Sequence, residues 1–121
     1  MDLYSQILLD HGQNPRNTGQ LKKATHRAEE VNLSCGDKTK VELRIKNYEL
    51  REIRHQTTGC LVCKFSASML SEKLIGKTVK EVLKMETEDC LKLLKIKLTM
   101  SRLKCALLPL LAIQKALKNE N

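Results

Sequence analysis

The sequence predicts a single domain that combines an antiparallel hairpin with several helices. Its 121 residues suit one domain with a modest core. Apolar and polar residues alternate between Val41 and Ile45, as they do in a half-buried strand. Near the N-terminus and again after Cys60, apolar residues recur at helical spacing instead. No internal repeat is present, so we expect one domain over residues 1–121.

The first half of the chain is expected to form a short helix followed by strands. Apolar side chains at helical spacing within residues 1–10 predict the helix, and the Pro-containing segment 14–17 ends it. The alternating strand 41–45 is followed by a turn at 46–48 and then by further apolar residues. The sequence therefore predicts an antiparallel hairpin within residues 37–55.

Helices are expected after residue 60. Gly76 is a natural stop for a first helix, whose apolar stripe contains Ala67, Leu70 and Leu74. Residues 78–81 have the form of a capping box, which predicts a second helix that carries Val82 and Leu83 inward. Ser101 and Pro109 mark the first part of a last helix, with an expected buried face of Leu107, Leu110, Leu111 and Leu117.

The charge of the chain favours anionic partners. Lys and Arg number 22 against 14 Asp and Glu, which gives a formal net charge of +8. Nucleic acid is an unlikely partner, because the basic residues are scattered and only Tyr4, Tyr48 and Phe65 could stack on bases. An acidic protein partner fits this composition better.

The cysteine content and the N-terminal residues indicate a cytoplasmic protein. Five cysteines occur in a chain that opens without a basic and then apolar signal segment, which favours a reducing compartment over a secreted disulfide framework. The longest apolar run, 105–113, is broken by Pro109 and is shorter than the roughly 20 residues of a membrane span. We therefore expect a soluble, cytoplasmic protein that does not enter the membrane.

Three cysteines lie in segments suited to metal binding. Cys35 and Asp37 flank Gly36, whose backbone freedom lets both side chains point at one centre. Cys60 follows a glycine at a predicted strand-to-helix junction, where free N–H groups stabilise a thiolate. Cys105 is expected near the start of the last helix. Three thiolates and one carboxylate form a complete ligand set for zinc or for an iron–sulfur cluster.

Lys104 directly precedes Cys105, so two positive influences are expected on that sulfur, the lysine and the helix start. This predicts a reactive thiolate at Cys105. Lys38, Arg102 and Lys104 are also expected to offset part of the negative charge of the site.

The other cysteines and the histidines have simpler interpretations. Cys63 forms a C-x-x-C pair with Cys60, which is a zinc or redox signal, but burial as a small residue in the helix is the favoured interpretation. Cys90 is interpreted as helix packing. The three histidines lie beside no cysteine, so they are expected to be surface or turn residues and not ligands: His11, His26 and His55.

Five segments together resemble the iron–sulfur cluster assembly scaffold family that includes IscU, SufU and the N-terminal part of NifU. They run in order along nearly the whole chain: Asn14-Pro15-Arg16-Asn17, Cys35-Gly36-Asp37, Gly59-Cys60 with Ser66-Ala67-Ser68-Met69, Gly76-Lys77-Thr78-Val79, and Arg102 to Pro109. The resemblance implies an α+β fold of the SufE/NifU type. In this fold a three-stranded antiparallel sheet carries helices, and a metal site lies at one end.

The resemblance also implies a site and a function. Cys35, Asp37, Cys60 and Cys105 match the ligand positions of the family. The implied function is a scaffold that receives sulfur from a cysteine desulfurase, assembles a [2Fe-2S] cluster and transfers it to apo iron–sulfur proteins. The persulfide acceptor is either Cys105, favoured by its expected position, or Cys35, favoured by the likeness to SufU. A homodimer is among the assemblies that the sequence allows.

Departures from the family pattern leave a second function open. Lys104 stands where IscU-type members have histidine, which is typical of SufU and favours a zinc-bound sulfurtransferase that accepts persulfide from a desulfurase. The compact segment from Gly76 to Cys105 is typical of IscU and favours the scaffold. The chaperone-binding Leu-Pro-Pro-Val-Lys segment is replaced by residues 97–101. A structural zinc domain that binds nucleic acid is the least favoured interpretation, because its site would be closed and inert.

Overall fold

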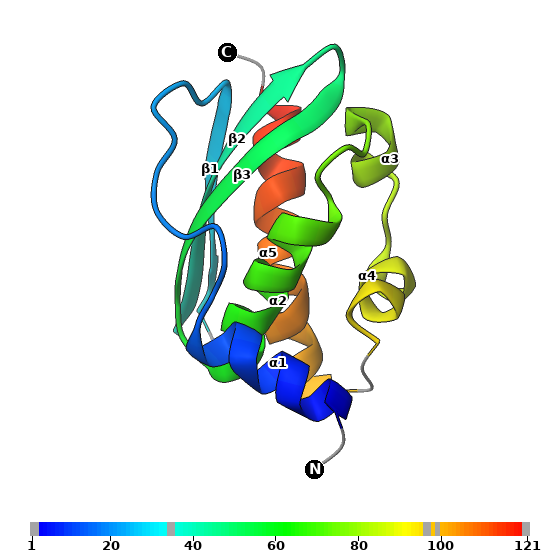
Figure 1. The fold of residues 1–121 in the computed structure, drawn as a ribbon. Coiled ribbons are helices and arrows are strands. Elements are labelled where there is room, and N and C mark those ends of the chain that lie inside the picture. The colour runs from blue at the N-terminus through cyan, green and yellow to red at the C-terminus, as the bar shows by residue number, and fades with distance from the viewer. Residues whose placement is uncertain (1–2, 34–35, 96–97, 99, 120–121) are drawn as a thin grey trace.

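A three-stranded antiparallel sheet forms one layer of the protein, and helices cover one of its faces (Figure 1). The structure is a computed structural model that describes residues 3–33, 36–95, 98 and 100–119. Strands β1 (His26–Asn32), β2 (Asp37–Lys46) and β3 (Glu49–Thr58) are neighbours in chain order. The α+β fold with three antiparallel strands is therefore confirmed.

A tight turn joins β2 and β3 and sets their register. Its two residues, Asn47 and Tyr48, have positive φ angles of 55° and 63°. This backbone is that of a type I′ turn, whose twist matches the twist of the strands on either side. The predicted hairpin is confirmed, and β3 continues beyond His55 as far as Thr58.

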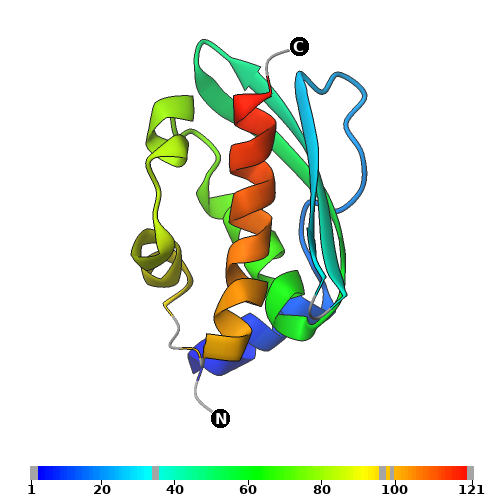
Figure 2. The same cartoon turned by 180° about the vertical axis from the view of Figure 1, so that it is seen from behind.

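Two long helices cover the sheet, and the shorter helices pack around them (Figures 1 and 2). In the described part of the chain, α2 (Leu61–Lys73) and α5 (Met100–Lys118) contact each other and the sheet. The N-terminal helix α1 (Leu3–Gln13) packs on α2. The short helices α3 (Val79–Leu83) and α4 (Thr87–Leu94) lie beside α5 on its side away from the sheet. No helix among the described residues is long and apolar enough to cross a bilayer.

The core lies between the sheet and the two long helices. The predicted stripe of α2 is buried, with Leu70 and Leu74 fully inaccessible. Each such leucine contributes about 1.5–3 kcal/mol through removal of its side chain from water. Other buried members come from the strands, α3 and α5: Val41, Leu43, Leu50, Ile53, Val82, Leu110 and Ile113.

The predicted face of the last helix is only partly correct. Leu110 and Leu117 are buried, and Leu107 is half-buried. Leu111 is 48% exposed, so its predicted burial was wrong. The buried face of α5 runs through Ala106, Leu110, Ile113 and Leu117, and the position next to Leu110 turns away from the sheet.

Pro109 lies inside α5, well after its start at Met100. A proline has no N–H to donate to the carbonyl four residues earlier, which here belongs to Cys105. The helix therefore lacks one backbone hydrogen bond beside a predicted ligand.

The predicted capping box is present at the start of α3. The hydroxyl of Thr78 accepts a hydrogen bond from the N–H of Glu81 at 3.1 Å, and the Glu81 carboxylate accepts one from the N–H of Thr78 at 3.3 Å. Two otherwise unpaired donors of the helix end are satisfied in this way. Val82 is consequently directed into the core, as predicted, and Leu83 is partly buried beside it.

A buried polar network fixes the turn at residues 14–17. The ring of His55 donates from Nε2 to the carbonyl of Arg16 at 2.7 Å. The hydroxyl of Ser68 accepts from the Arg16 N–H at 2.8 Å and lies 2.7 Å from Nδ1 of His11. His11 and His55 are only 8% and 2% exposed, so the prediction of surface histidines was wrong for these two. Each ring has partners on other elements, which sequence pattern alone does not reveal.

This network predicts that the protein loses stability in mild acid. Burial lowers the pKa of both His55 and His11 from the ordinary value of 6.5, and the charge of Arg16 lowers that of His11 further. As pH falls below about 6.5, the unfolded chain takes up protons that the folded protein excludes. The melting temperature should therefore be constant between about pH 8 and pH 7 and should fall as the pH drops further.

Thermal unfolding of wild type and of His55→Gln across this range checks the prediction. The variant should show a shallower acid slope, whatever its stability at neutral pH. His26→Gln, which removes a partly exposed ring on β1, is the control and should keep the wild-type slope. Equal slopes in wild type and His55→Gln would contradict the assignment of the acid sensitivity to His55.

Candidate metal centre

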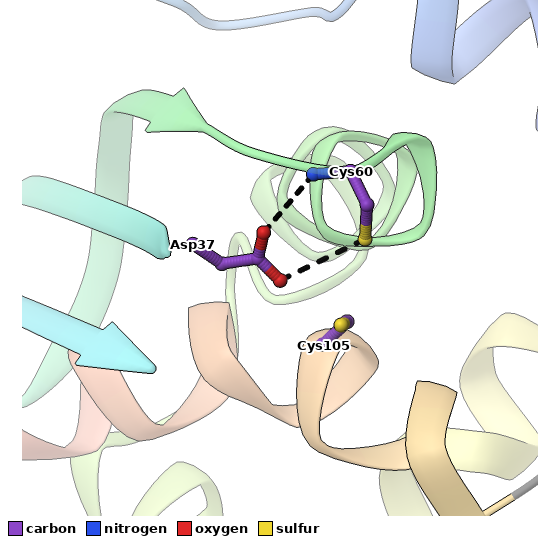
Figure 3. A group of neighbouring side chains, drawn as sticks. All are labelled: Asp37, Cys60 and Cys105. Carbon is purple, nitrogen blue, oxygen red and sulfur yellow. Dashed lines mark hydrogen bonds between the residues drawn. The ribbon is translucent and has the colours of Figure 1, made fainter. Parts of the chain in front are cut away.

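Three of the four predicted ligand residues meet at one end of the molecule (Figure 3). Asp37 begins β2, Cys60 lies between β3 and α2, and Cys105 belongs to α5. One carboxylate oxygen and two sulfurs from these residues all lie within 4.8 Å of one another. Ligand atoms of a tetrahedral zinc site stand about 3.8 Å apart, given metal–sulfur bonds of about 2.3 Å. A modest contraction would therefore let these three donors hold one metal ion. Cys35, the fourth predicted ligand, lies outside the described residues.

Asp37 orients Cys60 through two contacts. Its Oδ1 accepts a hydrogen bond from the backbone N–H of Cys60 at 3.1 Å, and its Oδ2 lies 3.7 Å from the Cys60 sulfur. Cys60 is the N-cap residue of α2, has an extended backbone, and makes no capping bond with its own side chain. Because the Asp37 carboxylate supplies an acceptor at this helix start, it performs part of the role of a capping residue. The carboxylate is 1% exposed and is held in place by this contact.

Gly59 is required for this close approach. Its φ of 138° is a backbone conformation that residues with a side chain rarely adopt. A Cβ at this position would also overlap the carboxylate of Asp37. The glycine before Cys60 therefore provides both the turn and the space for the neighbouring ligand.

Cys105 is buried, and its thiol holds its proton more strongly than the sequence predicted. It is 1% exposed, and burial, the Asp37 carboxylate and the Cys60 sulfur all raise the pKa of its thiol. The free N–H groups of a helix lie in its first turn. α5 begins at Met100, so Cys105 lies beyond that turn. Lys104 is exposed. These surroundings oppose a thiolate at Cys105 in the metal-free protein, and its role as a persulfide acceptor stays a prediction.

The two remaining cysteines of the described chain are packed in the interior. Cys63 is fully buried, its sulfur lies 3.5 Å from the hydroxyl of Thr39, and burial raises its pKa to about 12. Cys90 is also fully buried, its sulfur lies 3.9 Å from the carbonyl of Ala106, and burial raises its pKa to about 11. The interpretation of both as packed residues is confirmed.

Ser66 supports the site but was not recognised from the sequence. Its buried hydroxyl donates to the carbonyl of Ala106 at 2.5 Å. This bond ties α2 to α5 one residue beyond Cys105 and so fixes the distance between the segments that carry two of the ligands. The available signal was the segment Ser66-Ala67-Ser68, two hydroxyls within an otherwise apolar helical stretch. Both are buried, and buried hydroxyls need partners inside the protein.

The expected cationic neighbours do not enclose the site. Lys38 follows Asp37 on β2 and therefore points to the opposite face of the sheet, where it pairs with Glu29 at 3.4 Å. Arg102 and Lys104 are exposed on α5. The N–H groups at the start of α2 instead place a positive partial charge directly against the Asp37 carboxylate.

The sequence profile of the NifU-like N-terminal domain matches residues 3–120. The chain belongs to this family. Its predicted membership of the iron–sulfur cluster assembly scaffold family is thereby confirmed.

Two relatives of this NifU-like chain have names that state different functions. It is 37% identical over 82 residues to the iron–sulfur cluster assembly scaffold protein IscU 1 of Archaeoglobus fulgidus, a match that covers 68% of this chain and 54% of the relative. The chain thus spans about half the length of this and two similar curated IscU relatives that it matches. It is 27% identical over 135 residues to the zinc-dependent sulfurtransferase SufU of Bacillus subtilis, with 98% and 91% of the two chains covered.

A solved structure shares the fold of this NifU-like domain. The SufU of Fervidobacterium islandicum superimposes with a TM-score of 0.79 at 22% identity, over 98% of this chain and 96% of the other. At this level of identity the likeness concerns the fold alone.

Replacement of Gly59 should disrupt the metal centre. In Gly59→Ala the new Cβ strains the backbone and displaces the Asp37 carboxylate, so we expect a loss of about 1–3 kcal/mol in stability and weaker metal binding. Titration of the metal-free protein with Co²⁺ under anaerobic conditions, together with urea unfolding, measures both effects. Gly19→Ala is the matched control, because Gly19 also has a positive φ but has open space around it. Its metal affinity should equal that of wild type, and equal losses of affinity in the two variants would contradict the steric role of Gly59.

Proposed function

We propose that this NifU-like domain is a scaffold that assembles a [2Fe-2S] cluster on Cys35, Asp37, Cys60 and Cys105 and transfers it to apo iron–sulfur proteins. The observation that carries the proposal is the convergence of the Asp37 carboxylate with the sulfurs of Cys60 and Cys105. The name of the IscU relative supports the same function. In this proposal the cluster is cargo, and the protein provides ligands that can both hold and release it.

The mixed ligand set suits a cluster that must leave. Thiolate sulfur is a soft ligand that holds iron firmly, whereas a carboxylate oxygen is harder and exchanges more readily. Asp37 also has a partner when it is not bound to metal, because its carboxylate accepts the hydrogen bond of the Cys60 N–H. We infer that release begins at Asp37, since this ligand can leave the metal without becoming an unpaired buried charge.

Sulfur for the cluster would come from a cysteine desulfurase as a persulfide on Cys105 or Cys35. In the metal-free protein the buried Cys105 thiol is held protonated, which makes it a weak acceptor. A cation bound by the neighbouring donors would favour its thiolate, because coordinating thiols lose their protons. If Cys105 is the acceptor, sulfur transfer should therefore follow metal loading.

A zinc-bound sulfurtransferase is the alternative function. Its support is Lys104 before the last ligand, as in SufU, together with the match to SufU over 98% of the chain. Asp37, Cys60 and Cys105 supply sulfur and oxygen donors that zinc accepts. A bound Zn²⁺ would hold these ligands in place and keep the two sulfurs deprotonated.

Anaerobic reconstitution distinguishes the two functions. The protein is incubated with ferrous iron, cysteine, a cysteine desulfurase and a dithiol reductant that converts persulfide sulfur to sulfide. Iron, zinc and acid-labile sulfide are then measured together with the absorption spectrum. A coloured protein that contains iron and sulfide in equal amounts and activates an apo-ferredoxin supports the scaffold. A colourless protein that retains one zinc and accelerates desulfurase turnover supports the sulfurtransferase and contradicts the scaffold.

Substitution of Asp37 should prolong the life of the bound cluster. In Asp37→Cys the exchangeable oxygen is replaced by sulfur, so we expect a cluster lifetime at least several-fold longer and a correspondingly slower transfer to an apo-acceptor. Asp37→Ala should act in the same direction, because it removes the ligand at which release begins. Decay of the cluster absorbance with and without apo-ferredoxin measures both quantities.

Cys90→Ala, a change at a buried cysteine outside the site, is the control. Equal lifetimes in Asp37→Cys and wild type would refute the proposed role of the carboxylate.

A further inference from the structure

Cys63 is a thiol beside the metal centre that the proposed function does not use. It lies in the first turn of α2, three residues after Cys60, and is fully buried. Its side chain belongs to a small cluster with Cys105 and Leu108, and Cys60 packs against that cluster. A thiol outside the candidate ligand set therefore lies next to two thiols that belong to it.

Helix geometry brings Cys60 and Cys63 close to, but not within, the separation that a disulfide needs, and Cys60 packs against the cluster that contains Cys63. Residues three apart on a helix have Cβ atoms about 5–6 Å apart, and a disulfide needs about 3.5–4.5 Å. Cys60 is the N-cap residue, with an extended backbone at φ −73° and ψ 164°. Its N–H is held by Asp37 and its carbonyl accepts the first helix bond, from the N–H of Lys64, so its approach to Cys63 would disturb only these contacts at the helix start.

The two thiols differ in their access to solvent. Cys60 is partly exposed, whereas Cys63 and Cys105 are 0% and 1% exposed. A small oxidant in solution will therefore reach the sulfur of Cys60 first. This arrangement, an accessible cysteine followed three residues later by a buried one at a helix start, is typical of redox-active C-x-x-C pairs.

We propose that Cys60 and Cys63 form a redox dithiol, in which Cys63 protects the metal-binding Cys60 from irreversible oxidation when the site holds no metal. Hydrogen peroxide oxidises Cys60 to a sulfenic acid, and one water is released. The sulfur of Cys63 then attacks the sulfenic sulfur, its proton passes to the departing hydroxide, and a second water leaves as the S–O bond breaks and the disulfide forms. Two electrons pass from the two sulfurs to the peroxide. A dithiol reductant restores both thiols.

The disulfide would also prevent the metal centre from binding a metal ion. Bonded to Cys63, the sulfur of Cys60 is no longer available as a thiolate ligand, and the proposed set of four is left one donor short, with Cys35, Asp37 and Cys105. This consequence rests on the proposed function, whereas formation of the disulfide does not. The two claims can therefore fail separately.

Tryptic peptide mapping tests the dithiol directly. Cleavage after Arg54 and Lys64 leaves Cys60 and Cys63 together in peptide 55–64, whereas Cys35 falls in peptide 28–38 and Cys105 in peptide 105–115. The full-length, metal-free protein is treated with a small molar excess of hydrogen peroxide, alkylated and digested. We expect peptide 55–64 to lose the mass of two hydrogen atoms, and we expect dithiothreitol to restore it.

The variant Cys63→Ser separates protection from simple oxidation. Without the Cys63 thiol, Cys60 should gain the mass of two oxygen atoms, the irreversible sulfinic acid, at peroxide doses that wild type survives. Cys90→Ala is the matched control. Cys90 is as fully buried as Cys63, but its sulfur contacts the backbone carbonyl of Ala106 and not a thiol. It should behave as wild type. Peptide mapping of wild type alone gives a result even if Cys63→Ser does not fold.

Three results would overturn the proposal. The first is a cross-link of peptide 55–64 to peptide 105–115 or 28–38, which would make Cys105 or Cys35 the partner of Cys60. The second is equal sulfinic acid formation in wild type and Cys63→Ser. The third is an unmodified peptide 55–64 in both proteins. Binding of Zn²⁺ before and after peroxide tests the closure of the site separately. Retention of zinc by the disulfide form would refute closure while leaving the dithiol intact.

Discussion

The carboxylate of Asp37 accepts a hydrogen bond from the N–H of Cys60, and this contact holds the start of β2 against the start of α2. The rest of the metal centre is arranged around it. Gly59 leaves the space that the carboxylate occupies, and Ser66 ties α2 to α5 next to Cys105. A buried carboxylate must have such partners, because removal of its charge from water is costly. The same side chain is therefore a structural contact of the helix start and a candidate metal ligand.

The fold was predictable where periodic patterns reflect burial. The stripe of α2 and the alternation in β2 follow directly from side chains that the core requires. β1 was expected only from the family resemblance. Its sequence, His-Arg-Ala-Glu-Glu-Val-Asn, shows no apolar alternation, because the strand lies at the sheet edge and none of its residues is fully buried. Lys115 of α5 reaches this strand, where it donates to the carbonyl of Glu29 and pairs with Glu30. Long-range contacts of this kind leave no local signature.

The chemistry of the site was less predictable than its composition. Cysteine and aspartate beside glycine are distinctive in a sequence, so the candidate ligands could be named before the structure was known. The state of each ligand depends on tertiary surroundings. Cys105 was expected to be a thiolate from Lys104 and its helix position, yet it is buried beside a carboxylate. The same holds for His55, which is buried through a partner in a distant turn. In each of these cases the controlling neighbour is far away in the chain.

The three donors that meet in Figure 3 come from widely separated parts of the chain, and this has a mechanical consequence. An ion held by Asp37, Cys60 and Cys105 would join three distant segments of the folded chain, and its binding would stabilise the fold because these donors meet only when the protein is folded. Under the proposed function, delivery of the cluster would therefore loosen the protein that carried it. Local opening at this end of the molecule, and with it access for proteases, should rise after each delivery and fall again with the next loading.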